Sequence, residues 1–178
     1  MRQISKKNGI LLVLGVFAMI VLTAFDQFTK YLAVCHLKHK PAIPILPGVF
    51  ELSYLENHGA AFGILQGQKT FFILITVAAI AVMFYLYLSI PKQQRYLPLH
   101  LLFILLIPGA AGNFIDRCIN NYVIDFFYFR LINFPVFNVA DVYVSVATVF
   151  LMILFCFYYG EEDVDMIFRR LLFWKRDL

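Results

Sequence analysis

Four stretches of this sequence lack Asp, Glu, Lys and Arg for long enough to cross a lipid bilayer: residues 9–25, 70–90, 96–115 and 142–160. About 17 to 25 apolar residues in a helix span the hydrocarbon core. The whole chain is 62% hydrophobic and only 15% charged, whereas soluble domains carry about 25% charged residues. The composition therefore predicts an integral membrane protein, and it excludes an ordinary soluble enzyme, a disordered chain and a disulfide scaffold.

The basic residues predict how these spans are oriented. Four spans place both ends of the chain on the same side, and the segments on that side carry more Lys and Arg than the opposite segments. Because such an excess is typical of cytoplasmic segments, both termini are predicted to be cytoplasmic. Residues 91–95 then form a tight inner turn, and residues 161–178 form a cytoplasmic tail. The net charge of +4 reflects this topology and contact with anionic headgroups, so no nucleic-acid partner is expected.

The two outer loops, residues 31–69 and 118–138, are longer and richer in turn residues. Residues 49–54 and 122–127 have the composition of strands. The predicted fold class is therefore an all-α membrane protein: a four-helix transmembrane bundle with a small β platform formed by the outer loops. Residues 1–178 are expected to form one integral membrane domain. Cys35 and Cys118 fall on the same outer side, so a bridge between them stays open.

Polar residues near the membrane gather at the outer ends of the spans. A charge at the centre of a membrane helix costs about 2.5–3.5 kcal/mol, so such residues are rarely idle. The residues concerned are Asp26, Lys30, Asn57, Asn113, Asp116, Arg117, Asp125, Asn138 and Asp141. Their shared depth predicts a functional site on the outer face.

Most of these residues also have a structural explanation. Asp26 and Lys30 stand four residues apart and fit a helix ion pair. Asn138, with an acid three residues later, fits a helix N-cap. Asp116 and Arg117 could form an ion pair at headgroup level. Helix capping and pairing do not account for all the residues at this depth, which favours a shared role.

Three chemistries can be compared with this set. Ser5 and Ser89 fall on the inner side, Ser145 has no His or Lys near it in sequence, and Ser53 has no elbow motif, so a serine protease is not expected. The group Cys35, His36 and His39 lacks an acid, so no zinc site is expected. Two adjacent carboxylates can share one proton, and the pair can then act as acid and base without a metal or other cofactor. The alternative is a small four-span transporter or proton relay that uses the same acids, although such a relay would need acids across the membrane depth.

Five short motifs now carry a resemblance to a known family. They read Asp-Gln-Phe-Thr-Lys at 26–30, Asn-His-Gly-Ala-Ala-Phe at 57–62, Gly-Ala-Ala-Gly-Asn-Phe-Ile-Asp-Arg at 109–117, Val-Ile-Asp-Phe at 123–126 and Phe-Asn-Val-Ala-Asp at 137–141. In this order the chain resembles the lipoprotein signal peptidases (signal peptidase II), a family of bacterial membrane aspartic peptidases. Two positions depart from the family pattern, because Pro108 and Asn121 stand where Gly is frequent.

The resemblance implies that Asp125 and Asp141 form the catalytic pair, although the residues alone leave Asp116 as an alternative to Asp125. Because a helix N-terminus favours an anion, Asp125 is expected to hold the shared proton. The glycine-rich segment 57–63 is expected to act as a lid. Further site residues implied by the motifs, which bind substrate or support the acids, are Asp26, Lys30, Asn57, Gly59, Gly109, Asn113, Asp116, Arg117, Asn138 and Ala140.

The resemblance also implies the substrate and the location of the active site. The substrate is a prolipoprotein whose cysteine carries a diacylglyceryl group, and the cut falls just before that cysteine. The site lies at the outer leaflet of the bacterial cytoplasmic membrane, with membrane lipid as the other partner and the enzyme acting as a monomer.

Overall fold

Four long helices form the body of the protein. The computed structural model describes residues 6–59 and 69–172. Helices α1 (Lys6–Leu37), α2 (Lys69–Ser89), α3 (Leu97–Ile119) and α4 (Val139–Ile153) are followed by a π-helical turn (Leu154–Tyr158) and a shorter helix α5 (Glu161–Leu172). Four of the described helical segments are long and apolar enough to cross a membrane. The predicted four-helix membrane bundle is confirmed.

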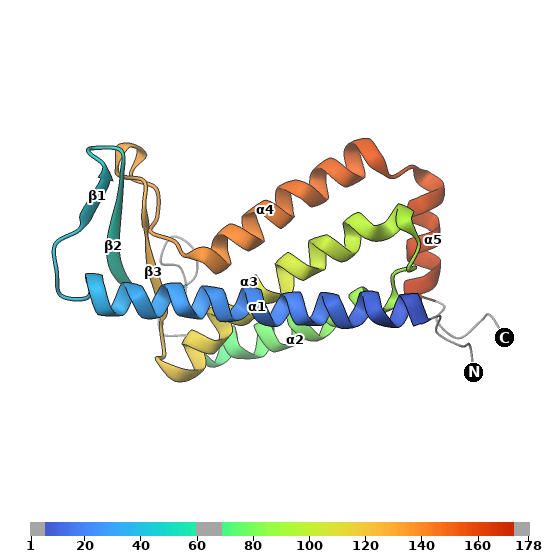
Figure 1. Cartoon of the computed structure of the whole chain (residues 1–178), viewed down its shortest axis with the longest axis horizontal. Coiled ribbons are helices and arrows are strands. Elements are labelled where there is room, and N and C mark those ends of the chain that lie inside the picture. The colour runs from blue at the N-terminus through green and yellow to red at the C-terminus, as the bar shows by residue number, and fades with distance from the viewer. Residues whose placement is uncertain (1–5, 60–68, 173–178) are drawn as a thin grey trace.

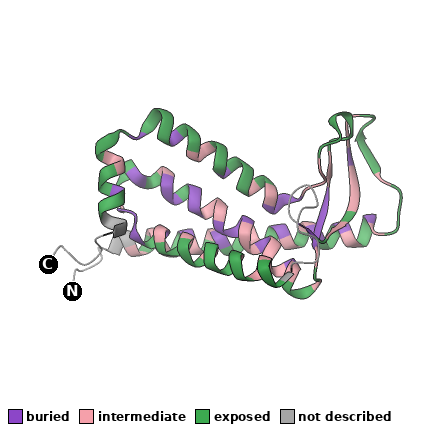
Figure 2. Ribbon diagram, turned by 180° about the vertical axis from the view of Figure 1, so that it is seen from behind, coloured by how far each residue is buried: buried purple, intermediate pink, exposed green. Residues whose placement is uncertain are grey.

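The outer surface of the bundle is apolar. Side chains such as Phe17 on α1 and Leu74 on α2 are 63% and 66% exposed, and Figure 2 shows exposed residues along the outward sides of these helices. The buried residues line the inside, where Tyr87, Leu102 and Ala147 are almost fully covered. Large apolar side chains that face outward all along a helix are accommodated by lipid rather than water.

A three-stranded antiparallel sheet covers one end of the bundle, opposite to the start of α1 and to α5 (Figure 1). Its strands are β1 (Ile43–Leu46), β2 (Phe50–Asn57) and β3 (Val123–Tyr128), in that order. The predicted β platform is therefore present. The prediction missed β1, whose four residues are all exposed. Since neither face of β1 is buried, no alternation of apolar and polar residues marks it in the sequence. Its edge position also explains why Pro44 is tolerated.

Helix α1 continues well past the apolar stretch 9–25 and ends at Leu37. The predicted span ended at residue 25, just before Asp26. In the structure the helix continues through Asp26 and Lys30, whose side chains are buried in the bundle and pair with each other. Pro108 lies inside α3, and Asn121 adopts a left-handed backbone with φ of 71°, which Asn tolerates well. Cys35 and Cys118 are both free and exposed, so no bridge joins them.

Candidate active site

The start of α4 fixes one acid of the site. Asn138 is the N-cap, and its side-chain oxygen accepts a hydrogen bond of 3.0 Å from the backbone N–H of Asp141. The Asp141 carboxylate accepts in return from the backbone N–H of Asn138, also at 3.0 Å. This capping box confirms the predicted N-cap. It holds the Asp141 carboxylate against the first turn of α4.

Strand β3 brings Asp125 to the same place. The backbone N–H groups of Phe126 and Phe127 donate to the carbonyl of Phe137 at 3.0 and 2.8 Å, and Phe137 donates back to Phe127 at 3.0 Å. This bridge aligns β3 with the residue just before Asn138. As a result, the Asn138 side chain donates to Asp125 at 2.6 Å. Phe137 belongs to the fifth motif, but its bridging role was not predicted.

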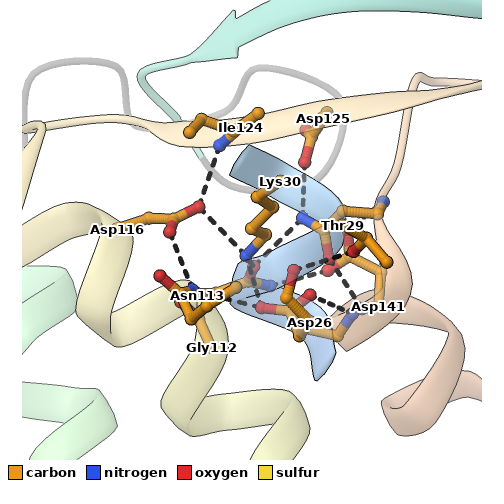
Figure 3. A network of polar contacts seen from close by, with 12 residues as sticks. Asp26, Thr29, Lys30, Gly112, Asn113, Asp116, Ile124, Asp125 and Asp141 are labelled. Atoms are coloured by element: carbon orange, nitrogen blue, oxygen red, sulfur yellow. Dashed lines mark hydrogen bonds and ion pairs between the residues drawn. The ribbon is translucent and has the colours of Figure 1, made fainter. Parts of the chain in front are cut away.

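Three asparagine side chains hold the two acids. Asn57 at the end of β2 donates to the second oxygen of Asp125 at 2.9 Å, and Asn113 on α3 donates to Asp141 at 2.8 Å. Asn138 also donates to the oxygen of Asn113 at 3.0 Å. Asp125 reaches down from β3 toward this group, and Asp141 lies below it at the start of α4 (Figure 3). The acids thus belong to one connected network.

The buried ammonium group of Lys30 contacts this network through Asn113. The Lys30 ammonium is 3.0 Å from Asp26, 3.0 Å from Asp116 and 2.9 Å from the side-chain oxygen of Asn113. All three charged side chains are at most 2% exposed. Since an ammonium has three N–H donors, Lys30 is fully satisfied. By occupying the oxygen of Asn113, Lys30 turns the amide nitrogen of that residue toward Asp141.

Asp26 and Asp116, the two acids that pair with Lys30, also accept hydrogen bonds from backbone N–H groups. Asp26 accepts from the backbone N–H of Ala140 at 2.8 Å, and Asp116 accepts from that of Ile124 at 3.0 Å. Gln27 donates to Asp116 at 3.0 Å. Asp26 therefore ties α1 to α4, and Asp116 ties α3 to β3. The Gln27 contact was missed by the sequence analysis, although Gln27 lies within the first motif.

Asp116 and Arg117, for which an ion pair was one possible explanation, bind different partners. Asp116 pairs with Lys30, while Arg117 donates to the carbonyl of Gly59 at 3.0 Å and lies over the ring of Phe72 at 4.8 Å. Successive residues on a helix point in different directions, which is why these neighbours do not meet. Arg117 instead joins α3 to Gly59, two residues after the end of β2.

Two glycines allow the helices to approach. A Cβ atom on Gly109 would lie 2.8 Å from the carbonyl oxygen of Ala140, and one on Gly112 would meet the carboxylate of Asp26. Neither position has room for a side chain. Gly59 is buried, whereas residues 60–63, and with them most of the predicted lid, lie outside the described residues.

The surroundings of Asp125 favour its protonated form. Burial, and next the charge of the neighbouring Asp141, raise the pKa of Asp125 to about 7, against the opposing effect of hydrogen bonds from Asn57 and Asn138. No group of His, Cys, Asp and Glu residues within 6–59 and 69–172 could hold a metal ion. A protonated Asp125 next to Asp141 can supply an acid and a base at neutral pH.

Comparison with known proteins decides the family. The family model described as signal peptidase (SPase) II matches residues 18–157, which include all five motifs. The chain belongs to the signal peptidase II family. It is 42% identical over 150 residues to the lipoprotein signal peptidase of Streptococcus pyogenes serotype M1, covering 84% of this chain and 95% of the relative. It is 44% identical over 138 residues to that of Streptococcus thermophilus strain CNRZ 1066, covering 77% and 88%.

Solved structures agree with this signal peptidase II assignment. Two structures described as a bacterial membrane enzyme, determined by the in meso method at 2.3 and 1.9 Å resolution, superpose with TM-scores of 0.71 and 0.70. Each is 31% identical in sequence. They cover 80% and 79% of this chain, and 87% and 91% of their own chains are covered. The protein is thus a membrane peptidase, as the motifs predicted.

Proposed function

We propose that this protein is an aspartic endopeptidase that removes the signal peptide from diacylglyceryl-modified prolipoproteins and cuts just before the lipidated cysteine. One observation carries the proposal: Asn138 contacts Asp125 by its side chain and caps the helix that presents Asp141. Two acids held this way at one end of a membrane bundle suit peptide hydrolysis without a metal. The names of the relatives, lipoprotein signal peptidases, favour this substrate class.

In the proposed mechanism the two acids have different tasks. Asp141, ionised at the N-terminus of α4, takes a proton from water, and the resulting hydroxide attacks the scissile carbonyl. Protonated Asp125 gives its proton to the carbonyl oxygen as this oxygen becomes negative. When the tetrahedral intermediate collapses, the C–N bond breaks, the leaving nitrogen takes the proton held by Asp141, and one hydroxyl proton of the intermediate returns to Asp125. Asn57 and Asn113 keep the acids in place throughout.

The location of the site fits a lipidated substrate. Asp125 lies on β3 and Asp141 in the first turn of α4. The sheet covers one end of the apolar bundle (Figure 1), a depth that corresponds to the membrane surface. We place this end at the outer leaflet of the bacterial cytoplasmic membrane, with both termini in the cytoplasm. The acyl chains of the substrate stay in lipid beside the bundle, so they set the depth of the peptide bond that is cut. The protein acts as a monomer in this proposal.

The direct test uses two synthetic precursor peptides that differ only in the diacylglyceryl group. We expect purified protein, with a chelator present, to cleave the lipidated peptide at least about 100-fold faster, because the acyl chains hold it at the site. Mass spectrometry is expected to find a product that begins with the modified cysteine. If neither peptide is cleaved while the protein conducts protons in vesicles, the relay alternative replaces this proposal.

Cleavage is expected to decline as the pH rises above about 7. A carboxyl group is protonated below its pKa, so Asp125, with a pKa of about 7, holds its proton below this pH and loses it above. In that range kcat/KM should fall about tenfold per pH unit. A profile measured from about pH 5 to about pH 9 checks this, and a constant rate across the whole range would contradict the role of Asp125 as the acid.

A further inference from the structure

Helix α5 (Glu161–Leu172) lies outside the part of the chain that matches the family, because the match ends at residue 157. It crosses the end of the bundle opposite the sheet and runs steeply across the direction of the spans (Figure 1). None of its residues contributes to the site described above. Its contacts nevertheless show a specific docking arrangement.

A salt bridge attaches the first turn of α5 to the 3-10 turn Gln94–Tyr96, just before α3. The Arg95 guanidinium donates to both oxygens of Asp163, at 2.7 and 3.3 Å. Tyr96 donates its hydroxyl to Asp163 at 3.1 Å, and the N–H of Gly160 donates at 3.2 Å. The hydrogen bonds from Arg95 hold the pKa of Asp163 below its usual value. Asp163 therefore joins the beginning of α5 to the 3-10 turn with several charge-assisted bonds.

The same arginine reaches the end of the fourth span. It donates to the carbonyl of Tyr158 at 2.6 Å and lies 4.3 Å from the ring of that residue. One turn further along α5, Ile167 is 9% exposed and packs in the same core cluster as Tyr96 and Tyr159. One face of α5 is thus fixed against the bundle.

Two large apolar side chains of α5 are exposed at opposite borders of the docked face, with charged residues between them. Phe168 is 55% exposed and Met166 is 41% exposed. Nearby in the chain, at the end of the fourth span, Phe157 is 86% exposed. Phe168 follows half-buried Val164 by four residues and so borders the docked face. Large aromatic side chains at the end of a span are typical of the membrane interface.

We propose that α5 is an interfacial helix that lies in the membrane surface at this end of the bundle, held by the Asp163–Arg95 latch, with Phe168 among the lipid chains. Arg169, exposed beside it, faces the headgroup phosphates. The polar residues Glu162 and Asp165 face water. A helix with one apolar edge and one charged face is stable in this position, and this inference does not depend on the reaction proposed above.

Fluorescence quenching in vesicles tests the position of the helix. Trp174 is the single tryptophan of the chain, so Phe168→Trp in a Trp174→Phe background gives one probe in the full-length protein. We expect phospholipids brominated near the headgroup end of their chains to quench at least about half of its emission. Asp165→Trp in the same background is the matched control, and we expect iodide in the water to quench it and brominated lipid to have little effect. If Phe168→Trp behaves like the control, α5 projects into water and the proposal is wrong.

The latch is tested in the same preparation. Adding Asp163→Asn to the Phe168→Trp protein removes the charge that Arg95 binds, and we expect the quenching by brominated lipid to fall by about half or more. Glu162→Gln removes a charge from the same turn without touching the latch, and its quenching should equal that of the parent. Equal quenching in all three proteins would show that the latch does not hold α5 at the surface.

Discussion

Asp125→Asn and Asp141→Asn are each expected to lower kcat/KM for the lipidated precursor by at least about 1,000-fold. An amide cannot take or give the proton that each carboxyl transfers, and acid–base catalysis of this kind contributes about 100- to 10,000-fold per group. The substitutions keep the size of the side chain, but each new amide has one acceptor oxygen where the acid accepts hydrogen bonds at both, so one neighbouring N–H donor loses its partner. The measurement is single-turnover cleavage in detergent, with a chelator present and with the fold checked by circular dichroism.

The matched control is Asp116→Asn, at the acid that residue chemistry alone could not separate from Asp125. The structure places Asp116 against Lys30, Gln27 and the backbone of Ile124. We therefore expect this variant to lose about 1–3 kcal/mol of stability while it keeps activity within about tenfold. An inactive but folded Asp116→Asn protein beside an active Asp125→Asn protein would move the catalytic pair to Asp116 and Asp141.

Lys30→Met is expected to destabilise the protein by about 3–5 kcal/mol, because it leaves the carboxylates of Asp26 and Asp116 buried without their cation. In thermal unfolding followed by circular dichroism this corresponds to a lower midpoint by roughly 10 °C. The loss should be much smaller when the same change is made in an Asp116→Asn background, since one of the uncompensated charges is then already absent.

Lys38→Met provides the comparison for Lys30→Met. Lys38 pairs with Glu56 at 2.8 Å, but the two side chains are 32% and 33% exposed, so the loss should stay below about 1 kcal/mol. If both variants unfold at the same temperature, the buried pairs around Lys30 do not support the fold as described.

The bundle was predictable because each span must be apolar along its length to enter lipid, and such stretches are visible in one dimension. The residues at which helices and strands begin and end were harder to predict from the sequence. Helix α1 passes through Asp26 and Lys30, which neutralise each other inside the protein, so a rule that ends a span at a charge stops too early. Strand β1 depends on pairing with β2 and has no buried face that could leave a pattern.

In the site, too, some features follow from the sequence and others depend on tertiary contacts. The capping box of α4 is local, since Asn138 and Asp141 stand three residues apart, and their spacing alone predicts it. The positions of the polar residues relative to the spans likewise indicated which of them gather at one end of the bundle. Which acid meets which cation depends on contacts between residues far apart in the chain, such as Lys30 with Asp116. Spacing along a helix predicts neighbours within that helix only, whereas the packing of α1, α3, α4 and β3 against one another determines the environment of each carboxyl group and hence its role.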